Sequence, residues 1–199
     1  LHKLAQQGHG RLDQPQDQPH PAERAWVTGT EVTVRCGKRE LLRVVTTVTD
    51  GKRVFISGGW PKNHTMAVEA DGSGEVAWQN TARVYVPSML VKDDQLYATM
   101  DAGFAVCWDS ATGKERWKER LGGAFFASPV LAGNRIYATN LAGKSYVFST
   151  DPKEFKLLAT NQLGEEMYAS PVISGSRLYL RVTAKRGGRQ EWLYCIGRN

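Results

Sequence analysis

The sequence predicts an all-β protein built from about four copies of one repeat, and two columns of residues carry this prediction. Prolines recur 42 residues apart at Pro87, Pro129 and Pro171. Aromatic residues recur at intervals of 42, 40 and 42 at Phe55, Tyr97, Tyr137 and Tyr179. Self-similarity at a fixed period of roughly 20 to 50 residues is typical of repeat architectures. The aromatic column extends the repeat back to residue 55 and so gives four copies.

Each copy contains the pattern of a β-hairpin followed by further strands. Apolar residues alternate around the aromatic column, as Leu96 and Ala98 do around Tyr97, and this period of two predicts strands. Turn-forming pairs precede these strands at the same offset: Asp50–Gly51, Asp93–Asp94, Gly133–Asn134 and Gly175–Ser176. Third strands are expected in TMAVEA, FAVCWD, SYVFS and EWLYCI, and fourth strands in EVAW, ERWKE and FKLLAT. Four antiparallel strands at this period predict the blades of a β-propeller.

The junction between the third and fourth strands carries the most specific motif. Asp109 is followed by Gly113 and, four residues later, by Trp117. A version one residue longer contains Glu69, Gly74 and Trp78. We expect the acid to accept hydrogen bonds from turn amides and the glycine to adopt a positive φ. We expect the tryptophan to pack between neighbouring blades, where it buries on the order of 200 Å².

This pattern resembles the tryptophan-docking motif of PQQ-like (quinoprotein-type) β-propellers. The resemblance covers roughly Leu41 to the C terminus, although the third and fourth copies lack the complete motif. It is closest to non-catalytic exported bacterial members such as the outer-membrane assembly propeller lipoprotein. It implies a periplasmic or extracellular location, and it implies a small core residue at Cys107, where the family usually has Ala.

The predicted organisation is an N-terminal extension with a proline-rich linker over residues 1–21, followed by propeller blades over 22–199. The blades span approximately 41–80, 83–120, 125–163 and 167–196. The last blade lacks a fourth strand in the sequence, and residues 22–36 are a candidate to close it through AERAW. Alternatively, TEVTVRCGKRELLRVV folds as its own hairpin. Four blades are compatible with a half-ring completed by a homodimer, a fragment of a longer propeller, or a small closed ring.

Composition excludes several classes of protein. No window approaches the roughly 18 consecutive apolar residues of a membrane helix. The net charge of +6 permits contact with nucleic acid, but the basic residues are scattered and the densest run, 114–120, alternates with acids. We therefore expect neither a membrane span nor nucleic-acid binding. The three cysteines, Cys36, Cys107 and Cys195, match no zinc or disulfide pattern and are expected to be small buried residues.

Catalysis has no support in the sequence. The quinoprotein dehydrogenases of the family hold PQQ and a divalent cation with carboxylates, an amide, a catalytic Asp and often an adjacent Cys pair, and no such pair exists here. Asp101 is expected to be a turn residue rather than a base. The four histidines, His2, His9, His20 and His64, lack metal-ligand spacing. We expect no enzyme activity, cofactor or metal; the alternative is a portion of a PQQ-dependent dehydrogenase whose cofactor ligands lie outside this chain.

Large side chains recur where the chain enters each blade, on the face around the propeller axis. They are Tyr85, Phe125, Phe126, Met167 and Tyr168. They are candidates for a surface that binds a protein partner, with core packing as the competing interpretation because aromatic residues are more often buried. The favoured function is a non-catalytic protein-interaction or assembly scaffold.

Overall fold

A computed structural model describes residues 26–28, 31–36, 39–44, 46–59, 62–185 and 187–197, with side chains from residue 47 onward. Every regular element of the described residues is a β-strand, and the strands form five antiparallel sheets. The all-β prediction is therefore confirmed. The predicted extension over residues 1–21 lies outside the described residues.

Three sheets are complete four-stranded blades in which consecutive strands are neighbours. The first contains β4 (Thr46–Thr49), β5 (Arg53–Gly58), β6 (His64–Glu69) and β7 (Val76–Asn80). The second contains β8 (Leu90–Lys92), β9 (Gln95–Met100), β10 (Phe104–Asp109) and β11 (Glu115–Arg120). The third contains β12 (Val130–Ala132), β13 (Arg135–Thr139), β14 (Lys144–Ser149) and β15 (Leu157–Gln162). We refer to these sheets as the first, second and third blades.

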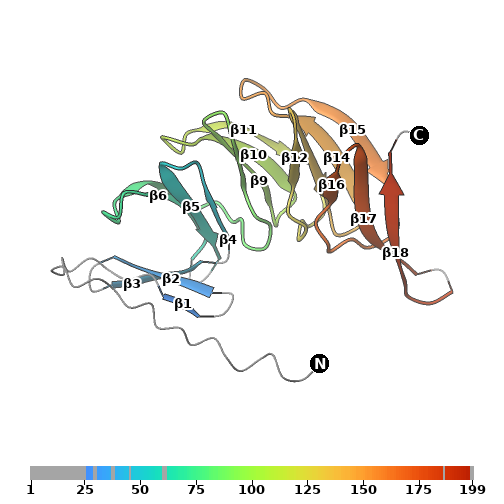
Figure 1. The fold of residues 1–199 in the computed structure, drawn as a ribbon, viewed down its shortest axis with the longest axis horizontal. Coiled ribbons are helices and arrows are strands. Elements are labelled where there is room, and N and C mark those ends of the chain that lie inside the picture. The colour runs from blue at the N-terminus through green and yellow to red at the C-terminus, as the bar shows by residue number, and fades with distance from the viewer. Residues whose placement is uncertain are drawn as a thin grey trace.

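The fourth blade has three strands: β16 (Val172–Ser174), β17 (Arg177–Ala184) and β18 (Gln190–Ile196). β18 pairs with β17 and forms the outer edge of this sheet. The sheets follow one another along an open arc and do not close into a ring (Figure 1). Of the three arrangements considered from the sequence, the small closed ring is therefore not the one that this chain adopts.

The N-terminal strands form a separate three-stranded sheet of β1 (Trp26–Thr28), β2 (Glu31–Cys36) and β3 (Arg39–Val44). β1 pairs with β2, and β2 forms a hairpin with β3. The described strands Trp26–Thr28 and Glu31–Cys36 thus pair locally and not with the last blade, where residues 22–36 were a candidate closing strand; residues 22–25 lie outside the described residues. Local pairing is favoured because residues close in sequence lose less chain entropy on pairing than distant ones do.

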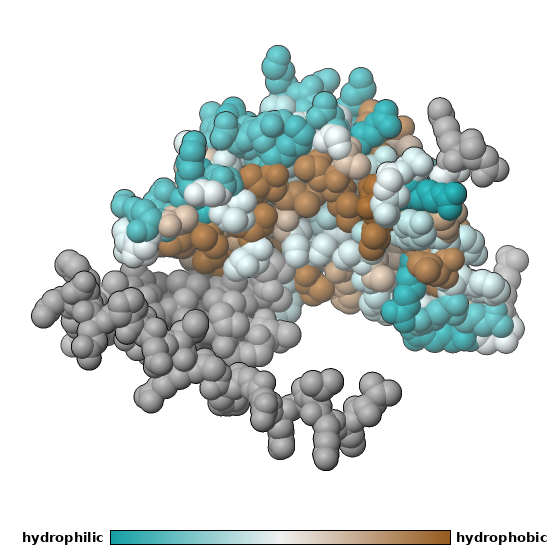
Figure 2. Space-filling view, in the orientation of Figure 1, coloured by the Kyte–Doolittle hydropathy of each residue, from teal (hydrophilic) through white to brown (hydrophobic). Residues whose placement is uncertain are grey.

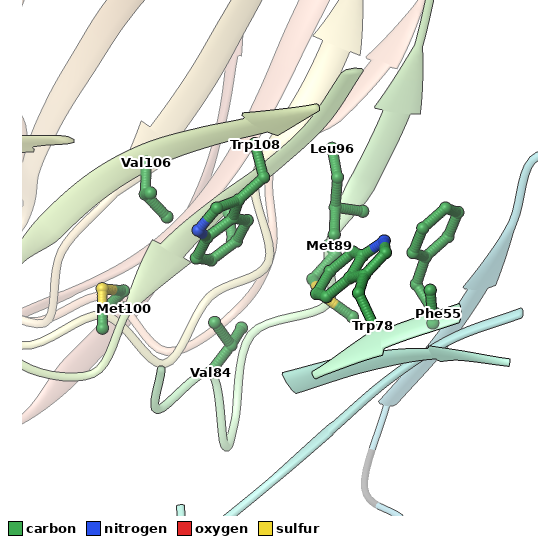
Figure 3. Close-up of a cluster of buried hydrophobic side chains, with 10 residues drawn as sticks. Phe55, Trp78, Val84, Met89, Leu96, Met100, Val106 and Trp108 are labelled. Atoms are coloured by element: carbon green, nitrogen blue, oxygen red, sulfur yellow. The ribbon is translucent and has the colours of Figure 1, made fainter. Parts of the chain in front are cut away.

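Side chains of adjacent blades interlock to form the core. β9 shows how one strand serves two interfaces, because Leu96 and Ala98 pack toward the first blade whereas Tyr97 packs toward the third. Figure 3 shows Trp78 between Phe55 of its own blade and Met89 and Leu96 of the next. Hydrophobic residues form a band across the visible face, and hydrophilic residues cover the rim near β11 and β15 (Figure 2). The core clusters therefore join each of the first three blades to a neighbour.

Candidate functional site

Two tryptophans join consecutive blades through both ring packing and a hydrogen bond. Trp78 Nε1 donates to the carbonyl of Ser110 in the second blade at 2.8 Å. Trp117 Nε1 donates to the carbonyl of Asp151 in the third blade, also at 2.8 Å. Each side chain is only 9% exposed. Since a buried indole N–H needs an acceptor, these carbonyls allow the tryptophans to be buried without an unsatisfied donor.

The turns before these tryptophans are held by acidic side chains. Asp109 Oδ1 accepts hydrogen bonds from the amides of Ala111 and Thr112 and from the Thr112 hydroxyl. Arg116 Nη2 donates to Asp109 Oδ2 at 2.7 Å. Burial alone would raise the pKa of the Asp109 carboxyl, but the Thr112 and Arg116 hydrogen bonds outweigh burial and lower that pKa below its usual range. Gly113, with φ of 69°, completes this turn.

In the first blade Asp71, and not the expected Glu69, accepts the hydrogen bonds of the turn. Asp71 Oδ1 accepts from the amide and the hydroxyl of Ser73, and the Ser73 hydroxyl lowers the Asp71 pKa. Glu69 instead pairs with Arg53 of the neighbouring strand, and its Oε1 atom lies 3.6 Å from Arg53 Nε. The turn is one residue longer, which moves the capping position from the strand end into the turn. Gly74 adopts φ of 74°, in agreement with its expected positive φ.

The third blade has no tryptophan at the equivalent position. Strand register pairs Ala67 with Trp78 and Cys107 with Trp117, and in the third blade it pairs Val147 with Ala159. Ala159 lies 42 residues after Trp117, so the repeat spacing alone would have identified this substitution. The sequence reasoning missed it because it treated the third copy only as lacking the motif.

The residues expected on the axial face divide into two groups. Phe125 and Met167 are fully buried in core clusters between blades. Tyr85 is half-buried, Phe126 is 38% exposed and Tyr168 is 50% exposed. The Phe126 and Tyr168 rings contact each other with centroids 6.1 Å apart. We call the second group, Tyr85, Phe126 and Tyr168, the axial aromatic row.

Backbone contacts fix the segments that carry this row. The Ser88 amide donates to Ser128 Oγ, and the Ser128 amide donates to Ser170 Oγ, each at 2.9 Å. This serine ladder connects the second, third and fourth blades. Asp101 accepts from the amide of Tyr85 at 3.0 Å and lies 3.4 Å from Arg83 Nε. The row is therefore attached to a rigid framework rather than to a free loop.

A polar recess lies beside the exposed end of the row. It has a volume of about 180 Å³ and is lined by Tyr168, Ala169, Arg181, Thr183, Arg189 and Glu191. Arg181 forms an ion pair with Glu191, and the Arg181 and Arg189 guanidinium groups are both well exposed. The recess adds hydrogen-bonding groups next to an exposed aromatic ring.

The two cysteines whose side chains are described differ from each other. Cys107 is fully buried in the core, and burial raises the pKa of its thiol to about 12. Cys195 is exposed, which corrects the expectation that it is a buried core residue. The side chain of Cys36 lies outside the described residues.

Within the described part of the chain, no three His, Cys, Asp or Glu side chains gather in an arrangement that could hold a metal ion. His64 Nδ1 interacts with the Lys62 carbonyl; the other histidines lie outside the described residues. None of the helices that a membrane span would require occurs among the described residues.

Comparison with known proteins finds a family match over part of the chain. The family model described as outer membrane protein assembly factor BamB matches residues 62–154. Comparison with curated proteins gave no significant match.

Solved structures share the fold at low sequence identity. BamB from Moraxella catarrhalis is 12% identical with a TM-score of 0.57, and the match covers 72% of this chain and 41% of that one. The quinohemoprotein alcohol dehydrogenase ADHIIG from Pseudomonas putida HK5 is 13% identical with a TM-score of 0.56, covering 69% of this chain and 28% of that one. The computationally designed Ika8 protein is 14% identical with a TM-score of 0.60, covering 85% and 57%. This chain thus spans less than half the length of the natural proteins it matches here.

Proposed function

We propose that this chain carries blades of the PQQ-like β-propeller family, as the family match over residues 62–154 supports, and that it is a non-catalytic scaffold that binds a protein partner through the axial aromatic row. The observation that carries the proposal is that Phe126 and Tyr168 are exposed and in contact with each other, whereas their chain neighbours Phe125 and Met167 are buried. Tyrosine and phenylalanine are enriched at protein interfaces because they bury a large area at a small loss of side-chain entropy.

The charges around the row support a protein partner. The Arg83 guanidinium lies 5.7 Å from the centre of the Tyr85 ring at one end, and Arg181 and Arg189 line the recess beside Tyr168 at the other. Arginine and tyrosine are enriched among the residues that dominate binding energy at protein interfaces. The row therefore fits a partner segment that carries apolar side chains flanked by carboxylates.

Location and assembly form part of the same proposal. The match to an outer membrane protein assembly factor supports export, to a periplasmic or extracellular compartment. The open arc supports a homodimer in which two half-rings complete one propeller, because two-fold pairing covers identical faces at once.

The test is capture of the partner by variants of the row. Phe126→Ser and Tyr168→Ser should each abolish co-purification of the partner that the parent retains from the source organism's cell envelope. Both positions are exposed, so circular dichroism and the melting temperature should stay near those of the parent. Leu157→Ser, at an exposed apolar residue on β15, is the matched control and should retain the partner. Retention of the partner by both row variants, or their unfolding, would contradict the proposal.

A second candidate is a portion of a PQQ-dependent dehydrogenase, favoured by the structural similarity to the quinohemoprotein alcohol dehydrogenase. The polar groups of the described axial turns do not fit such a site. Asp101 is engaged by the Tyr85 and Val86 amides and by Arg83. Asn140 is engaged by the Gly122 carbonyl and the Ala142 and Lys144 amides. Their oxygens are committed to the fold, so a quinone or cation would need ligands from outside this chain.

A further inference from the structure

The interface between the third and fourth blades differs from the two interfaces before it. At those two, one row of side chains facing the next blade is fully packed: Phe55, Ala67 and Trp78, and then Tyr97, Cys107 and Trp117. The same row in the third blade is Tyr137, Val147 and Ala159, and all three residues are only half-buried. Replacement of an indole by a methyl group thus leaves this row partly uncovered.

A cleft of about 250 Å³ occupies the space beside this row. The third blade contributes Tyr137 and Val147 to its wall, and the fourth blade contributes Leu178, Leu180 and Ile196. An apolar cavity of roughly 150 Å³ is large enough to bind benzene. The cleft therefore has the size and the chemistry for one planar aromatic group.

One end of the cleft carries unpaired hydroxyl groups. Thr139 Oγ1 and Ser145 Oγ are buried and have no hydrogen-bond partner among the described residues, and both residues line the cleft. They face each other across the β13–β14 pair, and Thr139 is 1% exposed.

The equivalent groups of the other two blades differ from each other. Thr99 Oγ1 of the second blade is also buried without a partner, whereas both hydroxyls of the first blade are paired. There Ser57 Oγ donates to the Val84 carbonyl at 2.5 Å, and Thr65 Oγ1 donates to the Ala82 carbonyl at 3.1 Å. A buried hydroxyl without a partner costs roughly 1 to 3 kcal/mol, so the third-blade pair has much to gain from a ligand that supplies one.

We propose that this cleft is a binding site for a small aromatic ligand of indole size that carries an N–H or O–H group. The ring lies against Tyr137, Val147 and Leu178, next to Ala159, which pairs with Val147 where the first two blades have tryptophan. Its polar group points to Thr139 and Ser145. This site is separate from the axial aromatic row and independent of the proposed scaffold function.

Calorimetric titration of the full chain with free indole tests the proposal. The parent should bind one indole saturably. Ala159→Trp should fill the cleft, weaken indole binding about tenfold or more and raise the melting temperature. Thr160→Trp, the same replacement at the next, exposed residue of β15, should leave both properties at the parental values. Absence of saturable binding by the parent, or equal binding by Ala159→Trp, would overturn the proposal.

Two further arms keep the test decisive. Val147→Phe fills the same cleft from β14 and should also block indole if Ala159→Trp does not fold.

Titration with N-acetyl-tryptophanamide shows whether the natural ligand is a tryptophan side chain or a free small molecule. Binding at least as tight as that of indole identifies the side chain of another polypeptide as the ligand, and binding of indole alone identifies a free small molecule. Phe126→Ser should bind indole as the parent does, which separates this site from the scaffold proposal.

Discussion

A Cβ atom on Gly113 would lie 2.5 Å from Cδ2 of Trp78, well inside van der Waals contact. The turn of the second blade is thus shaped around the indole of the first, and Trp78 also donates to Ser110 in that same turn. The second-blade motif therefore works in two directions: Gly113 receives Trp78 of the blade before it, and Trp117 reaches Asp151 of the blade after it. This relationship explains why the motif belongs to a repeat and not to an isolated hairpin.

The first prediction concerns Gly113. Gly113→Ala combines the strain of a positive φ with a clash against a buried ring and should lower the free energy of unfolding by about 2 to 4 kcal/mol. Gly72→Ala is the matched control because Gly72 has φ of 86° but no atom within 4 Å of an added Cβ. Gly72→Ala should lower the free energy of unfolding by about 1 kcal/mol, because it introduces only the backbone strain. Urea unfolding measures both; equal costs would show that the contact with Trp78 is unimportant.

The second prediction concerns the tryptophans. Trp78→Ala and Trp117→Ala should each cost roughly 3 to 5 kcal/mol, because each removes a buried ring and orphans a carbonyl acceptor. Leu157→Ala, at a residue that is 47% exposed, should stay within about 0.5 kcal/mol of the parent. Chemical denaturation of the three variants provides the comparison. A loss of less than about half a kcal/mol for Trp78→Ala or Trp117→Ala would show that the tryptophan does not stabilise the packing between blades.

The third prediction is a loss of stability at alkaline pH. Burial raises the pKa of Cys107 to about 12 and that of Tyr97 above its usual range, so the folded state retains protons that the unfolded chain releases. The free energy of unfolding should therefore fall as pH rises from about 9 to about 12, by up to about 1.4 kcal/mol per pH unit for each group.

Cys107→Ala should make this decline shallower, whereas Cys195→Ala, at an exposed thiol, should not change it. Urea unfolding at several pH values between 8 and 11 gives the slopes. Identical slopes for the parent and Cys107→Ala would show that the buried thiol does not titrate as its surroundings require.

The fourth prediction concerns assembly. The last sheet exposes Val172, Trp192, Leu193 and Ile196, an amount of apolar surface that favours association. Light scattering should give a particle of twice the 22.1 kDa chain mass, and Leu193→Glu should shift it toward the chain mass. Leu157→Glu, at an exposed residue of the third blade, should leave the mass unchanged. A parental particle of 22.1 kDa would contradict the half-ring dimer.

The sequence predicts the blades well because two local signals agree in every copy. The alternation around Tyr97 gives a strand, and Asp93 and Asp94 give the preceding turn with φ of 49° and 57°. Both signals depend only on neighbours in the chain. Strand identity and order therefore follow from the sequence for all four blades.

Pairing between distant segments is less predictable. AERAW resembles a fourth strand, yet β1 pairs with β2, because many segments share the same alternation and the pattern does not state which partner a strand takes. The candidate site shows the same limit. The repeat pattern marks Phe125 and Phe126 equally as candidates. Only the structure shows that Phe125 is buried and Phe126 is exposed.

The most direct test of a non-catalytic scaffold is a spectroscopic titration of the purified chain with PQQ in the presence of calcium. Because the axial oxygens of Asp101 and Asn140 are already engaged within the fold, we predict no saturable change in the visible absorption of the quinone. The same preparation should still retain its protein partner in the capture experiment. Stoichiometric binding of PQQ by this chain would contradict the scaffold proposal and favour the dehydrogenase alternative.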